Sequence, residues 1–190
     1  MINQDWKIRS RAHTCAHTGR AFTEGEEFTT ALFIDPKSKE LTRNDYSHEA
    51  WEALASELKP FSFWKTEYIP PEKKEDAEEE AMGKESPEEL LRRLIEENEI
   101  FTENARYILA VMLERGKVLR QTDTQQTEDS KLLIYEHKVT GDVLIIRDPE
   151  LHLDQVEAVQ DEVAQLLENG GRPPSEEMAE VETDAPQNAE

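Results

Sequence analysis

The stretch "SPEELLRRLI", residues 86–95, decides where the chain divides. Ser86 is a favourable helix N-cap, Pro87 suits the first helical position, and Glu89 completes a capping box. Aliphatic side chains then recur at helical spacing and form one apolar stripe, which consists of Leu90, Leu91, Leu94 and Ile95. We therefore predict that a helix, and with it a second folded module, begins at Ser86.

Acidic residues are concentrated in two short segments. The chain has a net charge of -21, and residues 72–89 hold nine acidic and three basic residues, a net charge of -6. Residues 172–190 hold six acidic residues and one arginine, a net charge of -5. We predict an acidic linker over 72–85 and a disordered acidic tail over 172–190, because both offer too few apolar side chains for a core. The folded modules are then residues 1–71 and 86–171.

The first module is expected to be rich in β-structure. Side chains alternate from Trp6 to Ala12, which predicts a strand with one buried face. Residues 27–35 and 39–46 follow as two more strands, and residues 61–69 as a last one. A helix capped by Ser47 precedes the last strand. These elements predict a small antiparallel meander with one helix, whose aromatic core is Trp6, Phe22, Phe28, Trp51 and Trp64.

The second module is expected to be helix-helix-hairpin-helix. After the helix at Ser86, Thr102 is predicted to cap a second helix over residues 103–119, apolar nearly all round in its middle. Residues 131–138 and 142–148 predict a β-hairpin, with Gly141 supplying a positive φ.

A final helix is predicted to end at the glycines of residues 169–171. Asp154 is its preferred N-cap, and Asp148 before Pro149 is the alternative start. The whole chain is therefore predicted to have an α+β fold.

The stretch "CAHTGRAF", residues 15–22, contains the single cysteine. It resembles the zinc-knuckle pattern Cys-x-x-Cys-Gly-x-x-Phe, with Thr18 at the place of the second cysteine. Together with "GEEF" and "DYSHEAW", it is similar to a set of uncharacterised bacterial proteins over about residues 6–70. The resemblance implies a fold and not a function.

A zinc site is one interpretation of this stretch. If the segment is extended, His13, Cys15 and His17 point to one side, with His48 or an acid as the fourth ligand. The sequence has no second ligand pair of the usual spacing, however. The favoured interpretation is metal-free, in which the Thr18 hydroxyl bonds to nearby backbone and Cys15 packs as a small hydrophobic residue.

A thiol enzyme is a second alternative, with Cys15 as the nucleophile and His13 or His17 as the base. Arg11 and Arg20 would then lower the pKa of the thiol. The sequence shows no oxyanion-hole signature, phosphate-binding loop or nucleophile elbow. We therefore predict no catalytic residues and no cofactor.

The start of the chain is locally basic, and Lys7, Arg9, Arg11 and Arg20 are the candidate binding residues. These residues could bind RNA phosphate or an acidic partner. Because the overall negative charge disfavours nucleic acid, the favoured interpretation is that they pair with the protein's own acidic linker or tail, or only keep a strand soluble. No signal peptide, membrane span or small-molecule site is recognisable. We predict a non-enzymatic cytoplasmic binding or adaptor protein that acts through a protein partner.

Overall fold

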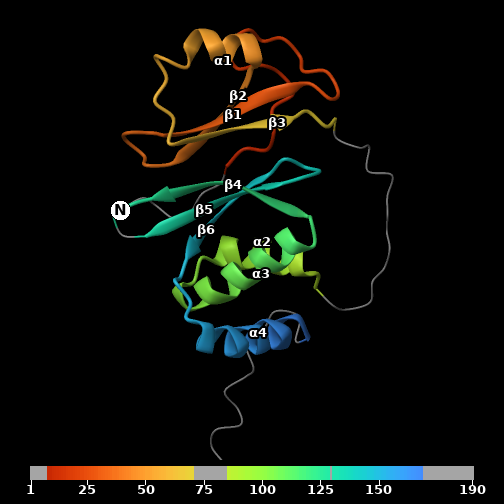
Figure 1. Ribbon diagram of the computed structural model, residues 1–190, viewed down its shortest axis with the longest axis vertical. Helices are drawn as coiled ribbons and strands as arrows, with labels where there is room; N and C mark the ends of the chain where they lie inside the picture. Colours follow the sequence, from red (N-terminus) through yellow and green to blue (C-terminus); the bar gives the residue numbers. More distant parts are fainter. Residues whose placement is uncertain (1–7, 71–84, 129, 169–190) are drawn as a thin grey trace, which may run out of the picture.

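The computed structural model describes residues 8–70, 85–128 and 130–168. The α+β fold is confirmed: two three-stranded antiparallel sheets are stacked face to face with helices on both outer sides. The layers follow one another as α1, the first sheet, the second sheet, the pair α2 and α3, and finally α4 (Figure 1). Several predicted features lie outside the described residues: residues 72–84 of the linker predicted over 72–85, the tail, Trp6 and Lys7.

The first sheet contains β1 (Glu27–Ile34), β2 (Leu41–Ser47) and β3 (Ser62–Glu67). Its order is β2-β1-β3 rather than the sequential order of a meander, because the segment containing α1 (His48–Leu54) carries the chain across to the other side of β1. The predicted cap is present, since the Ser47 side chain accepts a hydrogen bond from the Ala50 amide.

The prediction of a strand over Trp6–Ala12 is wrong for residues 8–12, the part that the structure describes. The Ala12 amide donates to Oδ2 of Asp45 at 2.7 Å instead of to a neighbouring strand. Arg11 turns into the interior, where its side chain is only 5% exposed. The alternating pattern in the sequence therefore does not correspond to a strand. The buried side chain in residues 8–12 is instead that of Arg11.

The second module begins with α2 (Pro87–Glu97), and both reciprocal bonds of the predicted capping box are present. A short 3-10 helix (Ile100–Thr102) leads into α3 (Glu103–Arg115). The Thr102 hydroxyl donates to the Glu99 carbonyl and makes no cap bond to α3, contrary to the prediction. The last helix, α4, spans Leu153–Glu168, so Asp154 lies inside its first turn and not at its cap.

The second sheet has the order β4-β5-β6 and contains one strand more than predicted. The hairpin of β5 (Lys131–His137) and β6 (Val143–Asp148) is present, and Gly141 has the predicted positive φ of 71°. The added strand is β4 (Leu119–Gln126). The helix predicted to reach Leu119 ends at Arg115, because Gly116 and the positive φ of Lys117 turn the chain.

Three apolar clusters hold the layers together. One joins the second sheet to α2, α3 and α4, and another joins the first sheet to α1 and the turn around Cys15. The third lies between the sheets and consists of Leu32, Leu41, Trp64, Leu132, Ile134, Val143 and Ile145. The two predicted modules thus share a core, and Trp64 belongs to this shared core rather than to the first module alone. Phe22 and Phe28 are buried in the first module as predicted.

No helix among the described residues is long and apolar enough to cross a membrane.

Candidate functional site

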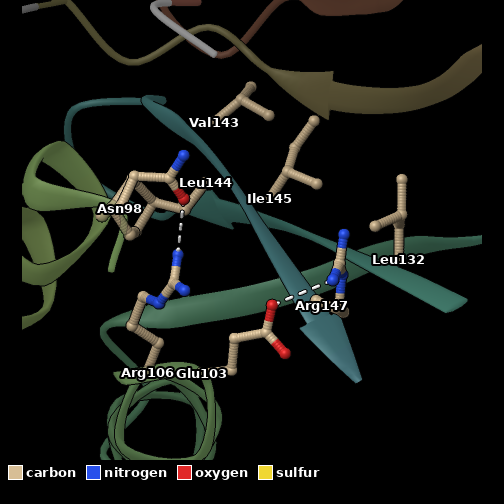
Figure 2. A pocket seen from close by; sticks show the side chains of 9 residues that line it. Asn98, Glu103, Arg106, Leu132, Val143, Leu144, Ile145 and Arg147 are labelled. Atoms are coloured by element: carbon tan, nitrogen blue, oxygen red, sulfur yellow. Dashed lines mark hydrogen bonds and ion pairs between the residues drawn. The ribbon is translucent and has the colours of Figure 1, made fainter. Parts of the chain in front are cut away.

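A hollow lined by described residues lies beside β6, the terminal strand of the second sheet (Figure 2). Its volume is about 50 Å³, and it is partly open to solvent. Its apolar wall consists of Ile95, Leu132, Val143, Leu144 and Ile145, and its polar lining consists of Asn98, Glu103, Arg106 and Arg147. We call this hollow the β6-edge groove.

The groove follows the edge of β6. Val143, Leu144 and Ile145 are consecutive and therefore point alternately to opposite faces of the sheet, yet all three line the hollow. Only a space beside the strand's edge contacts all three in this way. Because β6 pairs with β5 alone among the described residues, its other edge has no strand partner there. Unpaired strand edges are sites where an additional strand can bind.

The second wall of the groove comes from two helix ends. Asn98 ends α2 in the left-handed conformation, with a φ of 50°, and turns the chain toward α3. Glu103 and Arg106 follow in the first turn of α3. Figure 2 shows the Glu103 side chain reaching toward Arg147 and the Arg106 side chain reaching toward Asn98. Ile100, in the connection between the helices, is 80% exposed.

The two arginines of the groove have different bonds. Nη1 of Arg147 donates to Oε1 of Glu103 at 3.0 Å, whereas its Nε is buried and has no hydrogen-bond partner in the part of the chain that the structure describes. Arg106 donates to Oδ1 of Asn98 at 3.2 Å and to the carbonyl of Glu99 at 3.1 Å. Burial lowers the pKa of Arg106; the charge of Glu103 opposes this shift, and the positive charge of Arg147 adds to it.

Chemically, this arrangement combines an apolar wall, a free strand edge and two cationic side chains. An apolar wall supplies contact area, a free edge supplies backbone donors and acceptors, and guanidinium groups bind carboxylates well. The groove is thus suited to an extended polypeptide segment. Sequence reasoning missed it, because Arg106 and Arg147 lie on separate elements and neither belongs to a recognisable motif. The one available signal was the charged end of the otherwise apolar run "VLIIRD".

The basic residues predicted as a binding surface do not lie together in the structure. Arg11 is buried, donates to the Ile69 carbonyl at 3.1 Å, and lies 3.9 Å from Glu136. Arg9 is exposed, and Lys7 lies outside the described residues. Arg20 is bound to the carboxylate of Glu26. The prediction that Arg11 contributes to an exposed basic face is therefore wrong, since a partner on the second sheet draws it inward.

The segment from His13 to Phe22 forms a tight turn that is closed by backbone bonds. The Cys15 amide donates to the Arg20 carbonyl at 2.8 Å, and the Phe22 amide donates to the His13 carbonyl at 2.9 Å. The Thr18 hydroxyl accepts from the Arg20 amide at 3.3 Å, which is the turn-holding bond predicted for it.

Cys15 is buried in the core of the first module, as the metal-free interpretation predicted. Burial opposes ionisation of its thiol, but hydrogen bonds from the Thr18 side chain and from the amides of Ser47, Thr18 and His17 outweigh this effect. Together they lower the pKa of Cys15 to about 7. The turn therefore retains the donors that stabilise a thiolate.

The described residues contain no group of three side chains able to hold a metal ion. Nδ1 of His13 hydrogen-bonds to the Tyr68 hydroxyl at 2.7 Å, and His48 lies 3.3 Å from Glu52. Among the described residues, no histidine ring donates a hydrogen bond to the Cys15 sulfur. Neither the zinc site nor the thiol dyad thus has geometric support in this region.

No protein family, curated protein or solved structure matches the chain. The assignment of a function therefore depends on this protein's own residues.

Proposed function

We propose that this protein binds partner proteins through the β6-edge groove and catalyses no reaction. An extended segment of the partner would add to the second sheet as a fourth strand beside β6. We propose a cytoplasmic location with this role, as predicted from the sequence.

The observation that carries this proposal is the free edge of β6 beside a hollow with an apolar wall. Strand addition uses backbone hydrogen bonds for affinity and pockets for alternate side chains for specificity. Both are available here, because Val143 and Ile145 point to one face of the sheet and Leu144 to the other.

A non-enzymatic role is supported by the environment of Cys15. Its thiol is buried and hydrogen-bonded to groups of its own turn and of Ser47, which leaves no open path for a substrate. The groove itself has arginines but no nucleophile beside a base in its lining.

The test begins with selection of peptides from a randomised displayed library against the full chain. Each selected peptide is then synthesised in two forms, one unmodified and one with alternate backbone amides methylated. Methylation removes the strand-pairing donors and leaves the side chains unchanged, so it is the matched control. The unmodified peptide is expected to shift the amide NMR signals of Val143–Asp148, and the methylated one to lose most of its affinity. Selected peptides that bind equally in both forms, or that shift signals elsewhere, would contradict the proposal.

A further inference from the structure

We infer that the segment bound in the β6-edge groove carries a side-chain carboxylate opposite Arg147. In the same segment, aliphatic side chains two and four residues from this carboxylate lie opposite Ile145 and Val143. This inference rests on the proposed function and adds the chemical class of the partner.

The first argument is the incomplete bonding of Arg147. Among the described residues, its guanidinium makes one hydrogen bond, from Nη1 to Glu103, and its Nε is buried without an acceptor. A buried donor without an acceptor is costly. The side chain as a whole is 34% exposed, so a carboxylate in the groove would approach its exposed part and add an acceptor to a guanidinium that is incompletely bonded. Charge-assisted bonds between guanidinium and carboxylate are among the stronger hydrogen bonds in proteins.

The second argument is the balance of charge in the lining. Two arginines line the groove, and Glu103 is its only acidic residue. Arg106 donates to a side-chain amide oxygen and to backbone carbonyls, which are all neutral acceptors. The groove is therefore locally cationic, although the whole chain has a net charge of -21. An acidic segment would therefore be attracted to the groove and repelled by the negative charge of the rest of the molecule.

The third argument is register. Val143, Ile145 and Arg147 are two residues apart on β6. The Val143 and Ile145 side chains face the first sheet, and the Arg147 side chain starts on that face and reaches past the strand to Glu103 of α3. Residues of an added strand stand directly opposite them with side chains on that same face, and opposite charges in such pairs attract each other. The expected pattern is aliphatic-x-aliphatic-x-acidic, read in one direction or the other according to whether the strand adds parallel or antiparallel. This pattern needs a side-chain carboxylate at the acidic position. A ligand bound only through its C-terminal carboxylate would not need the pattern.

The experiment uses the peptides selected for binding at β6, made with an amidated C-terminus so that no terminal carboxylate remains. Each is synthesised with Glu and with Gln at the position opposite Arg147. Affinities are measured by titration calorimetry for the full chain and for two variants, Arg147→Gln and Arg115→Gln. Arg115 is exposed on α3 outside the groove and is the matched control.

With the unaltered chain, the Glu peptide is expected to bind about tenfold or more tightly than the Gln peptide. In Arg147→Gln this preference should disappear, and in Arg115→Gln it should be retained. If the peptides bind at β6 with equal affinity, the inference is wrong and the proposed function stands. If no selected peptide binds at β6, both fail. An affinity that follows a restored terminal carboxylate, or a dimer of the protein that Arg147→Gln dissolves, would also overturn the inference.

Discussion

Arginine occurs in two contrasting settings in this molecule. Between the sheets, Arg43 is 1% exposed and each of its nitrogens is bonded: Nε to Asp45, Nη1 to the Gly141 carbonyl, and Nη2 to Thr30. At the β6 edge, Arg147 is 34% exposed, bonds Glu103 through Nη1, and has no partner for Nε. The first setting is closed by the protein itself, and the second is open to a ligand.

This difference shows that the surroundings, and not the residue type, decide what an arginine does. Arg43 joins the two modules, because it is bonded to Asp45 and Thr30 in the first sheet and to a turn of the second. Removing it leaves a charge buried inside the protein. Removing Arg147 leaves Glu103, which faces the groove and is less enclosed. The closed region should therefore control stability, and the open region should control binding.

The largest expected effect is in the closed region. In Arg43→Ala, Asp45 stays buried without its cation, and breaking a buried pair in this way costs about 3–5 kcal/mol of unfolding free energy. Urea denaturation measures the loss. The control is Arg20→Ala, whose pair with Glu26 lies at the surface and contributes little. Equal losses in the two variants would remove the contrast between closed and exposed arginines.

A smaller but still large effect is expected at Gly141. Its φ is 71°, and an added methyl group would overlap the guanidinium of Arg11, which is itself buried. Strain and displacement together should cost Gly141→Ala about 2–4 kcal/mol. Gly19→Ala is the matched control, because Gly19 has a similar φ of 69° and open space around it. If Gly141→Ala loses no more unfolding free energy than Gly19→Ala, the Arg11 side chain moves aside at little cost and its contact with Gly141 contributes little to stability.

These two positions also show how far the sequence alone could lead. Gly141 was predicted as a turn glycine from the apolar runs on either side of it, and the capping box at Ser86 defined a helix, because such signals act over a few residues. The closing of Arg11 over Gly141 joins positions 130 residues apart, and no local pattern encodes it. β4 was missed because its sequence, "LRQTDTQQ", is polar and lacks the alternation of a half-buried strand.

The candidate site was beyond sequence reasoning for a similar reason. Arg106 and Arg147 are separated by 41 positions and meet only because α3 packs across the sheet beside β6. The basic residues near the start of the chain were conspicuous in the sequence, yet one is buried and another is paired at the surface. Clustering in the sequence therefore indicated a surface that the fold does not build.

A third prediction concerns Cys15, which lies beside the closed region since β2 carries both Asp45 and Ser47. The pKa of Cys15 is lowered from 9.0 to about 7 in the folded protein, so folding favours the thiolate. The resulting stabilisation is fully present above pH 9 and is lost as the pH falls through 7. Its upper limit is about 2.7 kcal/mol for a shift of two pKa units.

Unfolding free energies of the unaltered chain and of Cys15→Ala, compared at pH 6 and pH 9, test this effect. The difference between the two proteins should increase toward pH 9 in favour of the unaltered chain. A difference that stays constant would show that the thiol titrates with its ordinary pKa.

The smallest effect on stability is expected in the open region. Arg147→Gln removes a partly exposed ion pair, and the loss should be below about 1 kcal/mol. Denaturation alongside Arg43→Ala compares the two regions directly. A loss as large as that of Arg43→Ala would place Arg147 among the structural arginines and remove the basis for an open site.

The most direct test of the β6-edge groove is amide hydrogen exchange of the full chain with and without a saturating selected peptide. A strand added at the free edge of β6 would protect amides of Val143–Asp148 that face away from β5, and Arg147→Gln would reduce this protection for peptides with the acidic residue. The edge strands β2, β3 and β4 provide internal references in the same experiment. Protection confined to β6 is the predicted result; unchanged exchange at β6, with protection at another edge or at none, would contradict the account.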